Sequence, residues 1–174
     1  KTLGATDAMV GLLGTSFSIM QFIFASFWGG LSDKYGRRPI MLISIGIMVV
    51  AYVLFANATV LWLLFATRLL KGFGAANLSV AQAYISDVVP QDQRTKAFGF
   101  IGAAFGLGFI FGPSIGGVIN EYYGVSGVGY FAAVLAGVNF LMAWLYLKES
   151  LVEKSTTRDL FPNPFKDLVR FSHI

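Results

Sequence analysis

The sequence contains no cysteine, and its single histidine is His173. The absence of cysteine excludes disulfide scaffolds, thiolate nucleophiles and Cys/His zinc sites, and we expect neither a metal nor another cofactor. Charged residues make up only 13% of the 174 residues, whereas soluble domains carry about 25%. So few charges argue against a soluble enzyme, and no nucleophile–base pair or metal-ligand set falls within a shared segment.

Apolar residues are abundant: 56% of the chain is hydrophobic, with 20 glycines and 17 phenylalanines. Glycine is more frequent in membrane helices than in soluble ones, and aromatic residues collect at their ends. A spanning helix needs about 20 mostly apolar residues. The sequence therefore predicts an all-α polytopic transmembrane bundle with five spans, at residues 9–31, 40–55, 60–89, 97–120 and 122–147.

The basic residues are unevenly distributed between the predicted loops. Ten of the 13 Lys and Arg residues follow the first, third or fifth span. The positive-inside rule makes these three loops cytoplasmic, in a multi-pass protein of the cell (plasma or inner) membrane. The net charge of +4 is thus explained by topology, and we expect no nucleic-acid partner.

The chain starts at Lys1, without an initiator Met or a signal-peptide pattern. With cytoplasmic loops placed as above, the first span starts outside, so an upstream segment is expected to cross the membrane before it. We therefore expect a fragment, with an intact five-span protein as the alternative.

Two stretches of the sequence echo each other, GGLSDKYG at residues 29–36 and GGVINEYYG at residues 116–124. The first ends an inward span and the second an outward span, so the echo relates elements of inverted topology. Inverted repeats are typical of secondary transporters. Chance similarity between glycine-rich helix ends is the alternative.

The first echo leads into a tight turn that holds Asp33, Gly36, Arg37 and Arg38. Gly36 permits a positive φ angle, and Asp33 requires a donor, either Arg37 or the amino end of a helix. The spacing G-x-x-x-D-x-x-G-R-R resembles the signature that the major facilitator superfamily carries between its second and third helices.

Further motifs follow in the family's order. Arg68 precedes Gly72 by four residues, as in the fourth-helix motif, although Lys71 stands where many members have Gln. Residues 108–117 match the fifth-helix pattern G-x-x-x-G-P-x-x-G-G of the antiporter branches, and Asp87 with Arg94 resembles the loop between these helices. The chain resembles tetracycline and multidrug proton antiporters, from helix two to helix six.

This resemblance implies two regions and a function. Residues 1–147 correspond to the amino-terminal half without its first helix, and residues 148–174 to the cytoplasmic central loop. The implied activity is secondary active efflux of a small organic molecule, a drug, in exchange for protons by alternating access. The implied partners are the lipid bilayer, protons, this substrate, and the first helix and carboxy-terminal half of the same transporter. The alternatives are a facilitator or symporter of sugars or metabolites, and a membrane interaction protein without transport.

A polar stripe at helical spacing in the third span should face a cavity or another helix, because lipid cannot satisfy polar groups. Arg68 is expected to face the bundle interior and to seek an acid, which the first helix often supplies in the resembled antiporters; snorkelling or bracing is the alternative. Gln21 in the first span either lines the pathway or joins helices. The predicted substrate and proton pathway comprises Gln21, Arg68, Ser79 and Gln82.

Two further residue sets carry expected conformational roles. Asp33, Arg37 and Asp87 should form a cytoplasmic charge cluster, which the resemblance makes a latch; a static clamp is the alternative. The expected gate comprises Asp33, Gly36, Arg37, Arg38, Asp87 and Arg94. The expected kink comprises Gly108, Gly112, Pro113, Gly116 and Gly117. The resemblance implies that it seals the path when the outside is closed, and helix packing alone is the alternative.

The last region turns polar after residue 147, and apolar residues return from Phe161 onward. Asn163 is suited to a helix cap and Pro164 to the first helical position. We expect either a short amphipathic helix on the cytoplasmic interface or a loosely ordered linker.

Overall fold

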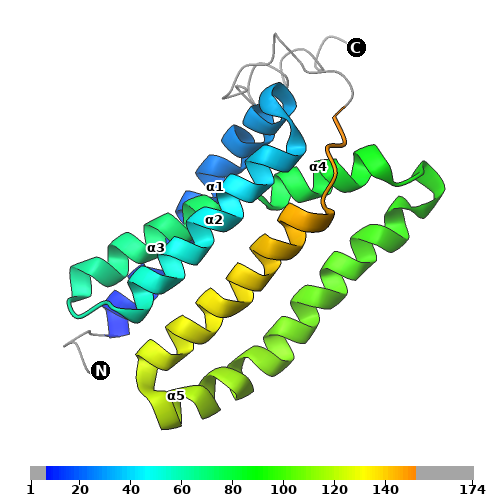
Figure 1. Ribbon diagram of the computed structural model, residues 1–174. Helices are drawn as coiled ribbons and strands as arrows, with labels where there is room; N and C mark the ends of the chain where they lie inside the picture. The colour runs from blue at the N-terminus through cyan, green and yellow to red at the C-terminus, as the bar shows by residue number, and fades with distance from the viewer. Residues whose placement is uncertain (1–6, 152–174) are drawn as a thin grey trace.

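The computed structural model describes residues 7–151, and this part of the chain consists of helices without strands (Figure 1), which confirms the all-α fold. The elements are α1 (Asp7–Tyr35), α2 (Arg37–Ala56), α3 (Leu61–Ala75), α4 (Leu78–Val88), the short 3-10 helix η1 (Gln91–Gln93) and α5 (Arg94–Tyr146). The expected amphipathic helix at residues 161–171 and the amino-terminal Lys1 lie outside the described residues.

Gly36 alone separates α1 from α2. Its φ of 114° and ψ of 150° lie in a region that is essentially restricted to glycine. Its N–H donates to the Ser32 carbonyl at 3.0 Å, which closes the last turn of α1. The turn predicted here is confirmed, and it places the charged residues after α1 at one end of the bundle.

The predicted span at residues 60–89 is broken into α3 and α4 (Figure 1). The break falls at Ala76 and Asn77, where side chains from α1 and α2 form hydrogen bonds with polar groups beside the break. Gln21 donates to the Ala75 carbonyl at 3.3 Å, and the Asn77 amide donates to the Ser44 hydroxyl at 2.8 Å. The apolar run alone could not show this break, because the partners that stabilise it come from α1 and α2.

The predicted fourth and fifth spans form the two arms of α5, which reverses direction at its lower end in Figure 1. A straight helix of 53 residues would extend about 80 Å, far beyond the roughly 30 Å of a bilayer core. The reversal occurs at Gly124, which has φ 69° and ψ −174°, while the dihedral angles stay helical through Pro113.

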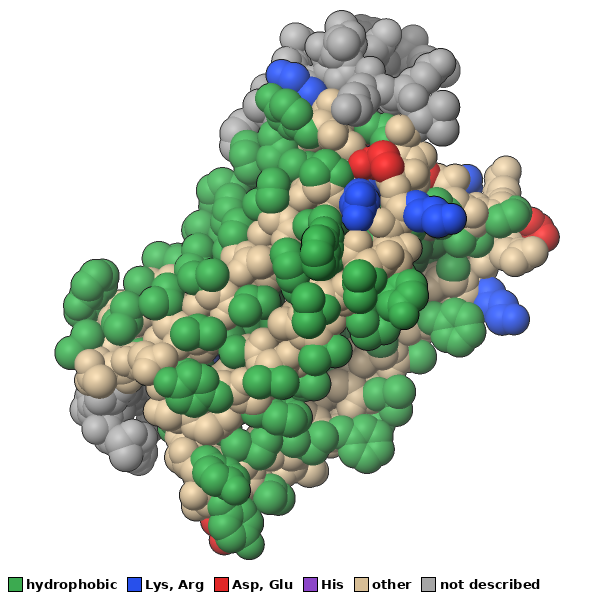
Figure 2. All heavy atoms as spheres, viewed as in Figure 1, with side chains coloured by type: hydrophobic (Ala, Val, Ile, Leu, Met, Phe, Trp, Pro, Cys, Tyr) green, Lys and Arg blue, Asp and Glu red, His purple; other side chains and the backbone are tan. Residues whose placement is uncertain are grey.

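Helices long and apolar enough to cross a membrane number three in the described part: Gly11–Tyr35, Arg37–Ala56 and Gln91–Tyr146. The five predicted spans differ from this number for two reasons. The third is divided into two short helices, and the fourth and fifth are one helical element folded back on itself. Apolar side chains cover most of the face in Figure 2, and the charged ones gather mainly toward one end.

The core lies where α1, α2, α3 and α4 meet. Trp28, Ile40, Ala76 and Val80 are buried together, and the Trp28 indole N–H donates to the Phe73 carbonyl at 2.7 Å. The second arm of α5 packs closely on α2, since a Cβ added at Gly129 would lie 2.8 Å from the Ala56 Cα.

The first arm of α5 is more exposed, and its glycines meet no other helix among residues 7–151. A Cβ added at any of the seven glycines between residues 99 and 117 would find no atom within 4 Å among the described residues. The close helix contact that the sequence suggests for Gly108, Gly112 and Gly116 is therefore not made in this part of the chain. Gly72 and Gly74 on α3 and Gly129 on the second arm of α5 make close approaches instead.

Candidate functional site

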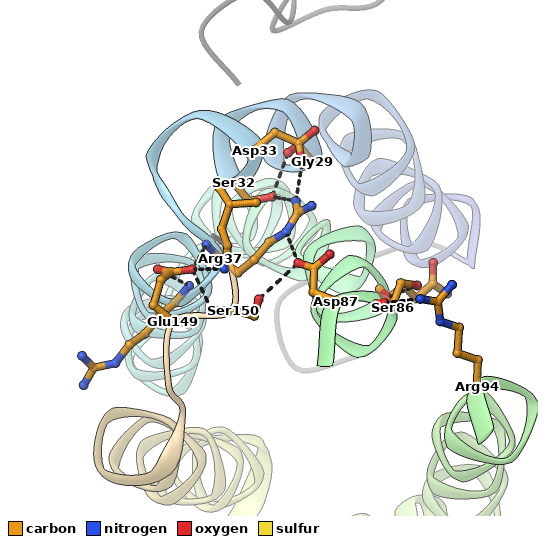
Figure 3. Close-up of polar contacts among 12 residues, drawn as sticks. Gly29, Ser32, Asp33, Arg37, Ser86, Asp87, Arg94, Glu149 and Ser150 are labelled. Atoms are coloured by element: carbon orange, nitrogen blue, oxygen red, sulfur yellow. Dashed lines mark hydrogen bonds and ion pairs between the residues drawn. The ribbon is translucent and has the colours of Figure 1, made fainter. Parts of the chain in front are cut away.

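Arg37 lies at the centre of a charge cluster at one end of the bundle (Figure 3). Its guanidinium contacts the Asp33 carboxylate at 2.5 Å and the Asp87 carboxylate at 3.0 Å. The three residues predicted to meet thus lie together, and they join the α1–α2 turn to the end of α4. Their role as a gate stays a prediction.

Two residues of this cluster are buried, and buried charges need ion-pair and hydrogen-bond partners. Arg37 and Asp33 are each only 7% exposed. Ser32, which is fully buried, accepts a hydrogen bond from Arg37 Nη1 at 2.6 Å and donates to the Gly29 carbonyl at 2.7 Å. The sequence interpretation missed Ser32, although its position one residue before Asp33 was a usable signal.

Glu149 is a second contributor that the sequence did not reveal. Its carboxylate accepts hydrogen bonds from the backbone N–H of Arg37 at 2.8 Å and of Arg38 at 3.3 Å. The next residue, Ser150, donates to the Asp87 carboxylate at 3.1 Å. The segment after α5 is therefore bound to the same cluster, and no local pattern connects residues so distant in sequence.

Gly36 makes room for this arrangement. As the residue before α2 it has no side chain with which to cap the helix, so the Glu149 carboxylate satisfies the first backbone donors instead. A Cβ added at Gly36 would lie 2.5 Å from a carboxylate oxygen of Glu149. The glycine is thus required by both its φ angle and its neighbour.

Two basic residues of the predicted gate have other partners. Arg38 donates through Nη2 to the Trp144 carbonyl at 2.9 Å, which joins α2 to the end of α5. Arg94 donates to the Ser86 carbonyl at 2.6 Å and the Val89 carbonyl at 3.1 Å. Arg94 therefore satisfies carbonyls at the carboxyl end of α4, and its described hydrogen bonds do not reach the Arg37 cluster.

Three of the four predicted pathway residues meet between α1 and α4. Gln21, Ser79 and Gln82 line a cavity of about 320 Å³. Ser79 also donates to the Ala25 carbonyl at 2.8 Å. Gln21 lines this cavity and also donates to the Ala75 carbonyl at the end of α3, and its role in a substrate pathway stays a prediction.

A larger cavity of about 650 Å³ lies between α1, α2, the α3–α4 break and both arms of α5. Aliphatic side chains, including alanines, and phenylalanines form most of its wall. Gln21, Tyr52, Asn77 and Asn139 supply polar groups. An apolar wall with a few placed polar groups is typical of small-molecule sites. Of these four residues, the sequence interpretation selected only Gln21.

Arg68 lies apart from the other pathway residues, beside the buried Lys71. The Arg68 guanidinium lies 5.9 Å from the centre of the Phe55 ring. The Lys71 ammonium lies 4.0 Å from the same ring and 4.8 Å from the Tyr52 ring. Neither cation forms an ion pair within residues 7–151.

The predicted kink residues lie along the exposed first arm of α5. Gly108 lines an open cavity of about 710 Å³ between α4 and α5. This cavity shares Leu78, Phe105, Phe109 and Asn139 with the cavity of about 650 Å³. Gly112, Pro113 and Gly117 are exposed, and Gly116 is half-buried. Within the described residues, no group of three His, Asp or Glu side chains could hold a metal ion.

Comparison with known proteins gives consistent similarities. Residues 1–173 match the Major Facilitator Superfamily. The chain is 41% identical over 142 residues to the class G tetracycline resistance protein of Vibrio anguillarum, covering 80% of this chain and 35% of that protein. It is 40% identical over 149 residues to the class B protein of Escherichia coli, covering 86% and 36%.

A solved structure is also similar. The crystal structure of the human organic anion transporter MFSD10 (TETRAN) superposes with a TM-score of 0.78 at 29% identity, covering 89% of this chain and 35% of that one. The chain thus spans about a third of the length of the relatives that it matches.

Proposed function

The chain belongs to the Major Facilitator Superfamily, and on that premise we propose that its protein exports a small organic molecule, a drug, in exchange for protons by alternating access. Identity of 41% and 40% to two tetracycline resistance proteins supports the drug as cargo. The observation that carries the proposal is the Arg37 cluster, which binds three separate chain segments at one end of the bundle.

This end is the cytoplasmic one in the proposal. Most of the described basic residues lie near the α1–α2 turn, the connection from α4 to α5 or the end of α5, at Lys34, Arg37, Arg38, Arg94, Lys96 and Lys148. The positive-inside rule directs such basic ends to the cytoplasm. With Arg37 bound to Asp33 and Asp87, the cytoplasmic end is closed. Opening this end requires these contacts to separate. A substrate or proton can drive the opening only if it binds the open and the closed state with unequal affinity.

Proton exchange needs an acid whose protonation differs between the two states. In the proposal a segment outside the described residues supplies this acid, and Arg68 influences it from α3. The pattern from Gly108 to Gly117 serves to seal the path when the outside is closed. Gln21, Ser79 and Gln82 line the route of the substrate.

The test uses the protein as its natural gene encodes it, in inside-out membrane vesicles. Tetracycline uptake should follow an imposed proton gradient with the vesicle interior acidic, and it should collapse when a protonophore is added. Uptake that survives the protonophore would favour the facilitator, and the absence of uptake relative to vesicles without the protein would favour a non-transporting membrane protein.

A further inference from the structure

The cavity of about 650 Å³ is lined by two carboxamide groups whose orientation is fixed by hydrogen bonds to the surrounding helices. These groups belong to Gln21 and Asn77, and both use their amide N–H groups on other parts of the protein. A carboxamide has a donating nitrogen and an accepting oxygen, and its partners determine which of the two atoms faces them. The chemistry of these partners therefore determines what the cavity offers to a ligand.

Asn77 is held in one orientation by a chain of two hydrogen bonds. Its amide nitrogen lies 2.8 Å from the Ser44 hydroxyl oxygen, and this hydroxyl donates its only proton to the Met41 carbonyl at 2.8 Å. The Ser44 hydroxyl can therefore only accept from Asn77, so the atom that faces it must be the amide nitrogen. Ser44 is fully buried, and the Asn77 carboxamide oxygen is left for other partners.

Gln21 is oriented in the same way. Its amide donates to the Ala75 carbonyl at 3.3 Å, and a carbonyl can only accept. Within residues 7–151, neither the Gln21 nor the Asn77 carboxamide oxygen accepts a hydrogen bond. A polar group without a partner is costly away from water, so both oxygens favour a ligand that carries O–H or N–H groups.

The rest of the wall determines which body such a ligand has. Phe17, Phe105 and Phe109 supply rings, and other residues supply aliphatic groups. No charged side chain is among the described residues that line this cavity. Tyr52 and Asn139 add polar groups that can donate as well as accept. The wall thus suits an uncharged aromatic body, and the two oriented carboxamides determine which polar groups that body should carry.

We propose that Gln21 and Asn77 select cargo that carries hydrogen-bond donors on an uncharged aromatic body, and that Ser44 is the positioning residue that orients Asn77. The substrate class is then phenols and aromatic N–H compounds. This inference rests on the proposed efflux function and names the class of its cargo. A molecule of similar shape whose oxygen can only accept would leave both carboxamide oxygens without a partner, and a site discriminates strongly against such a molecule.

The first measurement compares 2-naphthol, which carries an O–H donor, with 2-methoxynaphthalene, whose oxygen can only accept. Both probes are uncharged at neutral pH. Binding to the purified protein, encoded by its natural gene, is measured from ligand-dependent thermal stabilisation. We expect 2-naphthol to bind more tightly by about fivefold, the effect of one hydrogen bond, although the methoxy compound is the more apolar probe. Equal affinities would overturn the inference and would mean that another part of the protein bonds to the two oxygens.

The second measurement releases Asn77 through Ser44→Ala. Without the hydroxyl, the Asn77 amide can rotate and present its N–H groups to the cavity. The affinity for 2-methoxynaphthalene should therefore rise, and the preference for 2-naphthol should fall by about threefold. A role of Ser44 in stability alone would change both affinities alike. Ser16→Ala is the matched control, since this hydroxyl bonds to the Leu12 carbonyl within α1, and it should leave the preference unchanged.

A third measurement removes the Asn77 acceptor with Asn77→Leu, which keeps the approximate size of the side chain. This variant should bind 2-naphthol about fivefold more weakly and 2-methoxynaphthalene equally well or more tightly. Asn120→Leu, at an exposed position of α5, is the control and should change neither affinity. An unchanged preference in Ser44→Ala, or an equal loss for both probes in Asn77→Leu, would overturn the inference. If one of these two variants does not fold, the other decides.

Transport measured in parallel separates this inference from the function on which it rests. A preference for 2-naphthol that depends on Ser44, without any export, would contradict the efflux function and support the selective cavity. Proton-driven export of tetracycline together with equal binding of the two probes would contradict the selective cavity and support the efflux function.

Discussion

The carboxylate of Glu149 accepts a hydrogen bond from the backbone N–H of Arg37 at 2.8 Å, across 112 positions of the sequence. The contact places a negative charge at the amino end of α2, where the helix dipole favours it. It also fixes the segment after α5 beside the side chain of Arg37, which pairs with Asp33 and Asp87.

Glu149→Gln should weaken this connection. The variant keeps the size of the side chain and loses its charge, so we expect a free energy of unfolding lower by about 0.5–1 kcal/mol. Thermal unfolding of the purified protein measures the change. Glu121→Gln, an exposed carboxylate on α5, is the control, and equal melting temperatures for the two variants would contradict the helix-cap role.

Gly36→Ala should destabilise the protein for two reasons. The backbone has φ 114° and ψ 150°, where a side chain costs about 1–3 kcal/mol. The new Cβ would also meet the Glu149 carboxylate at 2.5 Å. Gly112→Ala, with open space around its Cβ, should be neutral or stabilising by up to about 1 kcal/mol. The melting temperature should therefore fall in Gly36→Ala and stay unchanged or rise in Gly112→Ala. An equal fall in both variants would refute the prediction.

Gly72→Ala should force α1 and α3 apart. Its Cβ would lie 2.5 Å from the Phe17 carbonyl oxygen and 2.8 Å from the Met20 Cβ, and overpacking of this kind costs about 1–3 kcal/mol. The free energy of unfolding reports the loss. Gly116→Ala, which meets no atom within 4 Å in the described part, is the matched control, and a similar cost at both positions would mean that helix packing at Gly72 is not responsible.

Asp33→Asn tests the proposed latch. Arg37 keeps Asp87 and loses its other anion, and a hydrogen bond to a charged group contributes about 1.5–3 kcal/mol. If the cluster holds the cytoplasmic end closed, the population with that end open should rise about tenfold or more, as measured by the labelling rate of a cysteine introduced into the cavity at Ala136.

The control for the latch is Asp92→Asn, which changes an exposed carboxylate in η1 and should leave labelling unchanged. Unchanged conformer populations and unchanged transport in Asp33→Asn would refute the latch and favour a static clamp. A change in thermal stability alone, without a change in labelling or transport, would also favour the static clamp.

Much of the architecture follows from local features that the sequence shows directly. Long apolar runs predict membrane helices because each helix satisfies its own backbone groups. Gly36 predicts the turn because few other residues adopt its φ angle. The sequence also indicates that Asp33, Arg37 and Asp87 meet, since it places both loops at one end of the bundle.

Glycine shows where local pattern stops being informative. The spaced glycines of the first α5 arm suggest close helix contact, yet Gly108, Gly112 and Gly116 have open space around them in the described residues. Gly72 and Gly129 make close approaches instead. The spacing permits an approach, but the position of the opposing helix determines whether it occurs.

The low charge and the length of the apolar runs determined by themselves that this is a helical membrane protein, and the ordered motifs indicated its family. Only the tertiary structure brought the Glu149 carboxylate to the amino end of α2 and divided the third predicted span at Asn77. It also set the Lys71 ammonium over the rings of Tyr52 and Phe55. The physical reason is that helix formation depends on neighbours in sequence, whereas these arrangements depend on partners that packing brings from other helices.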